Sequence, residues 1–164
     1  MSWWSVEADR RLRDHLVRFL DWEDAHVGFD KAVEGIPAAR RGVRPAGFEH
    51  SPWELLEHIR IAQDDILDFC LNPSYEHNLK WPDDYWPPES APSSAQAWTK
   101  SVRACKGSRE RLKRIVREVG DLTARVPTGN ARQTYLRAIL LAGDHAAYHV
   151  GQLVAVRRAL GEWK

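Results

Sequence analysis

The sequence predicts an all-α protein, a four-helix bundle with one long connection between its second and third helices. Three observations support this prediction. Four stretches repeat apolar residues at helical spacing, three connections bearing proline or glycine separate them, and no stretch alternates apolar and polar residues as a strand does. A length of 164 residues suits one domain, and we expect that domain to span residues 1–164.

The first helix is expected at about residues 5–34. Its apolar positions and one histidine fall on a single arc at 100° per residue: Leu12, Leu16, Phe19, His26 and Val33. Gly35 and Pro37 follow, which is typical of a helix end. The sequence therefore places His26 on the inward side of this helix.

The second helix has the clearest start in the chain. Ser51 suits the N-cap, Pro52 the first helical position, and Glu54 the third, so that a capping box is predicted. The helix is expected to end at Asn72-Pro73. The connection over residues 72–92 contains four aromatic residues, Tyr75, Trp81, Tyr85 and Trp86, and is expected to pack on the body of the domain rather than to act as a flexible linker.

The third and fourth helices are expected at about residues 93–119 and 131–160. Apolar residues cover more than half of the last helix, so it should contact more than one neighbour, and we expect a homodimer that buries part of this surface. The long connection can run the length of a bundle, which would make the second and third helices parallel and give an up-down-down-up order. An up-down-up-down order stays open.

Composition excludes several classes of function. Lys and Arg total 24 and Asp and Glu total 23, and this balance argues against a nucleic-acid partner. No apolar run approaches the length of a membrane span, and the first residues lack the pattern of a secretory signal. Two cysteines, Cys70 and Cys105, are too few for a disulfide framework. We therefore expect a cytoplasmic protein without a membrane partner.

Three histidines are candidates for chemistry. His145 and His149 lie four residues apart on the last helix, a spacing that allows two imidazoles to bind one cation. A zinc-protease motif needs a glutamate between its two histidines to act as the base, but positions 146 and 147 of this chain are both alanine. His58 lies at the edge of the apolar stripe of the second helix. The three can form a metal site with open coordination positions, or they can be core histidines that bond to neighbouring groups.

These motifs together resemble the DinB/YfiT-like superfamily, a damage-inducible bacterial family distinct from the DNA polymerase of the same name. The resemblance covers nearly the whole chain. It rests on Ser51-Pro-Trp-Glu-Leu-Leu-Glu-His58-Ile-Arg60, on Asp144-His145-Ala-Ala-Tyr148-His149-Val-Gly151-Gln152, on Trp81-Pro82 and Tyr85-Trp-Pro-Pro88, and on the segment from Ala25-His26 to Phe29-Asp30.

The resemblance implies a bundle of up-down-down-up order, often dimeric, with one divalent metal ion per chain held by His58, His145 and His149. Zinc or nickel is expected, with iron as a further option. The resemblance also implies an activity on a small-molecule substrate, either metal-dependent hydrolysis or transfer that uses a low-molecular-weight thiol. A non-catalytic metal-binding dimer with a structural or stress-related role is the alternative.

Groups that could assist the metal are few. His26 and Glu23, one turn apart on the expected first helix, are candidate catalytic groups or a structural pair. Glu54 and Asp65 lie on the same side of their helix as His58, where they could orient its second nitrogen or remain solvated. The aromatic connection can roof the site or simply cover the bundle.

Two further groups, a cluster of arginines and the two cysteines, need an interpretation. Arg40, Arg41 and Arg44 can receive an anionic substrate or form an ordinary solvated surface. Both cysteines are expected to be small core residues.

Overall fold

The computed structural model describes residues 6–163, and its regular structure is helical throughout. The α-helices are α1 (Val6–Phe19), α2 (Phe29–Val33), α3 (Pro52–Leu71), α4 (Ala95–Glu118) and α5 (Tyr135–Ala159), with short 3₁₀ turns at Ala38–Arg40 and Asp83–Tyr85. Residues 6–163 contain no β-strand, only an isolated bridge between Arg125 and Thr134. The all-α prediction is confirmed.

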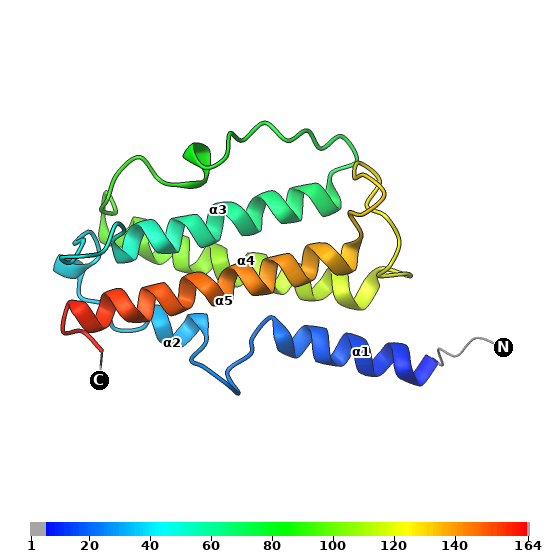
Figure 1. Ribbon diagram of the computed structural model, residues 1–164, viewed down its shortest axis with the longest axis horizontal. Helices are drawn as coiled ribbons and strands as arrows, with labels where there is room; N and C mark the ends of the chain where they lie inside the picture. Colours follow the sequence, from blue (N-terminus) through cyan, green and yellow to red (C-terminus); the bar gives the residue numbers. More distant parts are fainter. Residues whose placement is uncertain (1–5, 164) are drawn as a thin grey trace.

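Three long helices form the centre of the molecule. α3 packs against both α4 and α5, while α1 contacts α4 and α2 contacts α5. Figure 1 shows that α3 and α4 run in one direction and that α1 and α5 run in the other. The chain returns from the end of α3 to the start of α4 by a connection that crosses the outer side of α3, which is how two successive helices come to be parallel.

The prediction of one continuous first helix over residues 5–34 is wrong. The helix ends at Phe19 and the chain resumes as the short α2 after a loop over residues 20–28; residue 5 lies outside the described residues. Asp21, at the end of α1, pairs with Arg109 and Lys113 of α4 rather than continuing the helix. Acidic groups are also unfavourable at a helix C-terminus. A tertiary ion pair therefore ends a helix that periodicity alone would continue.

The start of α3 follows the prediction closely. The Ser51 hydroxyl accepts a hydrogen bond from the backbone of Glu54, and the Glu54 carboxylate accepts one from the backbone of Ser51, so the capping box is confirmed. The helix ends at Leu71, one residue before Asn72, as expected. Because both ends of α3 are set locally, the position of His58 along the helix follows from the sequence.

The ends of the other long helices differ slightly from the expected ones. α4 begins after Ser94, whose hydroxyl caps Ala97, within two residues of the prediction. α5 begins four residues later than expected, after the N-cap Thr134. Residues 130–133 form a turn instead, because the Gln133 backbone donates to the carbonyl of Asn130 at 3.0 Å.

The core has two apolar clusters along the bundle. One gathers α2, the first half of α3, the start of α4 and the end of α5, around Leu55, Ile59 and Leu153. The other gathers α1 with the opposite halves of α3, α4 and α5, around Leu67 and Leu112. Within residues 6–163, no helix combines the length and apolar character that a membrane crossing needs.

Candidate metal centre

Three histidines from two helices converge between α3 and α5. Nε2 of His58 lies 3.0 Å from Nε2 of His145, and the ligand atoms of His58, His145 and His149 all lie within 4.8 Å of one another. His58 and His149 are buried and His145 is half-buried. The predicted convergence of these three side chains is therefore confirmed. The four-residue spacing on α5 places its two rings on one side of the helix, facing α3.

The outer nitrogens of two of the rings are held by fixed acceptors. Nδ1 of His58 donates to the backbone carbonyl of Tyr85 at 2.8 Å, and Nδ1 of His149 donates to Oε1 of Gln152 at 2.7 Å. Because a carbonyl oxygen only accepts, each Nδ1 carries the proton, and each Nε2 is left with a lone pair. Gln152 in turn donates to the hydroxyl of Tyr148 at 3.3 Å, which orients its amide.

An aromatic stack fixes the plane of the His58 ring. Trp86 lies parallel to His58, with ring centroids 3.9 Å apart and an angle of 2°, and His50 stacks on the other side of Trp86 at 3.8 Å. Trp81 lies further out, at 6.4 Å from His58, and is largely exposed. The aromatic connection therefore roofs the histidine cluster, as one of the two sequence interpretations expected.

The environment keeps the three imidazoles neutral. Burial lowers the pKa of His145 to about 4, and His58 adds to this effect. Burial, together with His145 and His58, lowers the pKa of His149 to about 4 as well. Burial also lowers the pKa of His58, against the opposing effect of the Tyr85 carbonyl. A neutral imidazole is the form in which histidine binds a metal ion.

Nδ1 of His58 bonds to the carbonyl of Tyr85 and not to Glu54 or Asp65, so of the two interpretations of these carboxylates, direct orientation of His58 is wrong. Glu54 is buried and paired with Arg44 at the start of α3. The carboxylate of Asp65 accepts hydrogen bonds from the hydroxyls of Tyr85 at 2.7 Å and of Tyr75 at 2.9 Å. Asp65 therefore acts on His58 only through Tyr85, whose side chain it anchors and whose carbonyl accepts from the histidine.

His26 and Glu23 lie away from the histidine cluster. The break in the first helix places both in the loop between α1 and α2, where both are exposed. Nδ1 of His26 donates to the carbonyl of the adjacent Val27, and no hydrogen bond among the described residues joins His26 to Glu23. The expectation of an inward-facing pair one turn apart is wrong, because the residues are not helical.

The loop arginines and the cysteines have structural partners. Arg40 pairs with Glu162, Arg41 lies over the ring of Trp98, and Arg44 pairs with Glu54, so they do not form one anion site. The cysteines Cys70 and Cys105 are buried, and burial raises the pKa of each thiol, for Cys70 to about 12. Their interpretation as core residues is confirmed.

The partners of the cluster differ in how far the sequence could indicate them. The acceptor for His58 is a backbone carbonyl, and its residue type carries no signal for that role. Gln152 had a signal, since it lies three residues after His149 on the same helix face, where side chains can meet. His50 and Trp86 were brought together only by the path of the connection.

The residues present suit a divalent transition metal. Two buried imidazoles offer oriented Nε2 lone pairs, and the third lies within reach of both. Nitrogens bound to one tetrahedral ion lie about 3.3 Å apart for bonds of about 2.0 Å, within the range seen here. A set of neutral nitrogen ligands favours zinc, nickel or iron over magnesium or calcium, which prefer oxygen.

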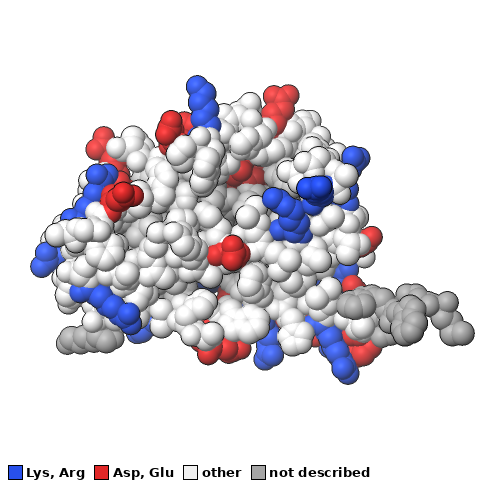
Figure 2. All heavy atoms as spheres, viewed as in Figure 1, with Lys and Arg blue, Asp and Glu red and all other residues white. Residues whose placement is uncertain are grey.

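The face above this cluster is sparsely charged. Figure 2 shows that much of the surface over α3, α5 and the connection is white, with isolated Asp or Glu groups near the middle of the view and Lys or Arg groups to the right of them. Tyr148, Trp81 and Leu141 are large exposed side chains that lie on α5 and the connection. The approach to the half-buried His145 is therefore apolar and aromatic rather than strongly charged.

Comparison with known proteins identifies the family. No match is found among curated proteins, and none among solved structures. The sequence matches the DinB superfamily over residues 21–153, which include the whole of α3 and α4 and all three clustered histidines. The chain thus belongs to the DinB superfamily.

Proposed function

We propose that the protein is a metal-dependent enzyme that acts on a small molecule at His58, His145 and His149. The observation that carries this proposal is the convergence of three neutral imidazoles, two of them with the Nδ1 proton held by a fixed acceptor. Three protein ligands leave coordination positions for water or substrate, which is the pattern of catalytic rather than structural zinc sites.

The chain's own residues would bind the metal ion, and neighbouring groups orient the histidines that do so. His58 is held in its plane by Trp86 and in its protonation form by the Tyr85 carbonyl. His149 is held by Gln152. A bound divalent metal would supply a Lewis acid that makes a water or a thiol a stronger nucleophile near neutral pH. The aromatic roof limits the access of bulk water, and the half-buried His145 marks the more open side.

Two reactions fit this arrangement, hydrolysis and transfer to a low-molecular-weight thiol. The protein's own thiols, Cys70 and Cys105, are buried and carry raised pKa values. A transfer reaction would therefore need a separate thiol as co-substrate. Screening the metal-loaded protein with and without an added thiol, against activated esters and small electrophiles, distinguishes the two. Turnover only in the presence of the thiol supports transfer.

Metal content is the first test. Untagged protein is analysed for zinc, nickel and iron beside His145→Ala and the control His15→Ala, which changes an exposed histidine on α1. We expect about one metal ion per chain in the wild type and in the control, and its loss in His145→Ala. Equal metal content in all three proteins, or no uptake of any of these metals by the wild type, would refute the site.

The arrangement of the helices supports a finer description of the bundle. We infer that the chain adopts the up-down-down-up order, with α1 and α2 together in the place of the first helix. Leu140, Leu141 and Tyr148 of α5 are exposed. A second inference concerns assembly: this exposed apolar stripe supports a homodimer that forms through α5. Light scattering tests this: we expect a dimer mass for the wild type and a monomer mass for the double variant Leu140→Glu, Leu141→Glu. A monomer at every wild-type concentration would contradict the dimer.

A further inference from the structure

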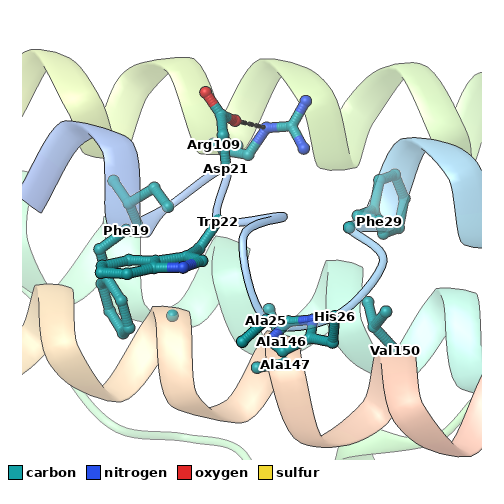
Figure 3. Close-up of a pocket in the computed structure, with 13 residues that line it drawn as sticks. Phe19, Asp21, Trp22, Ala25, His26, Phe29, Arg109, Ala146, Ala147 and Val150 are labelled. Atoms are coloured by element: carbon teal, nitrogen blue, oxygen red, sulfur yellow. Dashed lines mark ion pairs between the residues drawn. The ribbon is translucent and has the colours of Figure 1, made fainter.

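A cavity lies on the other side of α5 from the histidine cluster. It measures about 340 Å³ and is half-open to solvent. Its floor is a run of small side chains on α5, including Ala146 and Ala147, and its other walls come from the loop between α1 and α2 and from α4 (Figure 3). None of the three clustered histidines lines it.

The break between α1 and α2 creates this cavity. Phe19, at the end of α1, lies so close to Gly143 of α5 that a Cβ atom there would clash with its ring. Phe29, at the start of α2, is buried on the other side of the opening. The loop between them passes over the floor without filling it. The same departure from a continuous helix that displaced His26 therefore leaves an apolar space bounded by aromatic rings.

Arg109 of α4 forms ion pairs on both sides of the loop, with Asp21 at its start and with Asp30 in α2 just after it. Its Nε lies 3.0 Å from Asp21 at one end, and its Nη2 lies 3.1 Å from Asp30 at the other. Between these two anchors, Trp22 and His26 are exposed and lie at the rim of the cavity. The loop is thus attached at its ends, while its middle covers the opening.

The charges of the site are already paired. Arg109 and Asp21 are the ionic groups that line the cavity, and they pair with each other, while Asp21 also pairs with Lys113 and Asp30 with Lys106. A charged ligand would find no unpaired partner among them and would lose its hydration. An uncharged, flat ligand would replace water against apolar and aromatic walls, and this replacement is favourable.

We propose that this cavity is a binding site for an uncharged aromatic molecule of about two rings, separate from the metal centre. Its size supports that choice, because an apolar cavity of about 150 Å³ accommodates one benzene ring. Phe19 and Phe29 bound the site at its ends, and Trp22 offers an indole face at the rim. The occupant would lie between the loop and Ala147.

A matched pair of fluorescent probes tests the proposal. 1-Naphthylamine is an uncharged molecule of two fused aromatic rings, and 4-amino-1-naphthalenesulfonate is the same molecule with one negative charge. We expect the uncharged probe to bind one per chain, with a Kd on the order of 10 µM. The charged analogue should bind about tenfold or more weakly.

Variants locate the probe. Ala147→Phe fills the cavity from its floor and Trp22→Ala removes part of its rim, so each should weaken binding of the uncharged probe by about tenfold. Ala159→Phe, at the exposed end of α5, makes the same substitution outside the cavity and should leave binding unchanged. Because Trp22 is exposed in a loop, its variant keeps the test valid if Ala147→Phe fails to fold.

Each other outcome overturns the proposal in a distinct way. If the wild type does not bind the uncharged probe, the proposed site is refuted. If the wild type and both cavity variants bind it equally, the probe binds elsewhere, such as on the exposed residues of α5. Equal binding of the two probes refutes the choice of an uncharged ligand. Binding that disappears in His145→Ala would assign the probe to the histidine cluster instead. The test therefore does not depend on the proposed metal function.

Discussion

The carbonyl of Tyr85 accepts a hydrogen bond of 2.8 Å from Nδ1 of His58, so the connection between α3 and α4 determines how a histidine of α3 presents its other nitrogen. The side chain of the same tyrosine donates to Asp65 at 2.7 Å and lies 3.0 Å from Nε2 of His77. Asp65 stands on α3 as well. α3 therefore positions its own His58 indirectly. Asp65, about two turns further along the helix, anchors the side chain of Tyr85, and the carbonyl of Tyr85 accepts the hydrogen bond from His58.

Tyr85→Phe is expected to weaken metal binding, because it removes the anchor of the segment and leaves the carbonyl in place but less constrained. Groups that orient metal-bound histidines typically contribute about tenfold or more to affinity. The zinc Kd, measured by competition with a chromophoric chelator, provides the readout. Tyr75→Phe is the matched control, because its hydroxyl also donates to Asp65, at 2.9 Å, yet its carbonyl does not contact His58. Similar affinities in the two variants would show that the Tyr85 anchor does not act on His58.

Gly143→Ala and Gly107→Ala should change stability in opposite directions. A Cβ at position 143 of α5 would clash with the ring of Phe19, whereas one at position 107 of α4 meets nothing within 4 Å. We expect a loss of about 1–3 kcal/mol in the free energy of unfolding for Gly143→Ala, from overpacking. For Gly107→Ala we expect a gain of about 0.5–1 kcal/mol, because alanine favours the helix. Urea denaturation measures both values. A Gly143→Ala protein that is more stable than the wild type would mean that Phe19 of α1 can move away from α5 without a loss of stability.

The pairing of Glu54 with Arg44 predicts a loss of stability in acid. Burial opposes ionisation of Glu54, but hydrogen bonds from Arg44 and from the Ser51 backbone outweigh it and hold its pKa below the usual value of 4.5. Because that pKa is lower in the folded chain, the ionised group stabilises the fold above about pH 4.5. This contribution is lost as the pH falls through the folded pKa.

Glu54→Gln tests this prediction by chemical denaturation at pH 7 and at pH 3. The wild type should be more stable than the variant at pH 7. The difference should shrink at pH 3, because below about pH 4.5 Glu54 of the unfolded chain takes up a proton and the ionised group no longer favours the fold to the same extent. Glu49→Gln, at an exposed position, should show no such difference at either pH. A difference between the wild type and Glu54→Gln that is the same at both pH values would mean that the charge of Glu54 does not stabilise the fold.

Arg157 should be far more important to stability than its neighbour Arg158. The buried guanidinium of Arg157 donates to the carbonyls of Lys31 and Ala32 in α2 and of Glu162 near the C-terminus. Arg157→Ala would leave these acceptors without their donor, and we expect a loss of about 2–4 kcal/mol in the free energy of unfolding.

Two variants control for side-chain loss and for charge at this position. Arg158→Ala, at an exposed position, should change stability little. Arg157→Lys should restore stability only in part, because an ammonium group cannot reach acceptors on both sides as a planar guanidinium does. Thermal unfolding of the three variants gives the comparison. Equal melting temperatures for Arg157→Ala and Arg158→Ala would contradict the role of Arg157 in holding α2 against α5.

Much of the candidate site could be predicted because it depends on local rules. The capping box at Ser51 sets the start of α3 and so the position of His58, and the four-residue spacing sets the two histidines of α5 on one side. Helix capping and the spacing of residues on one helix face each depend on residues only a few positions apart, so they can be predicted without the rest of the chain. The resemblance to the family, carried by the same motifs, added the expectation that the two helices face each other.

The sequence by itself therefore determined the helical class, the ends of α3 to within a residue and the identity of the three clustered histidines. Only the tertiary structure decided where the first helix breaks, because Asp21 and Asp30 respond to Arg109, a residue of α4 far along the chain. It alone decided that Tyr85, through its backbone, and Trp86, through its ring, hold His58. Such contacts depend on the path of a connection in space, and neither residue type nor spacing records that path.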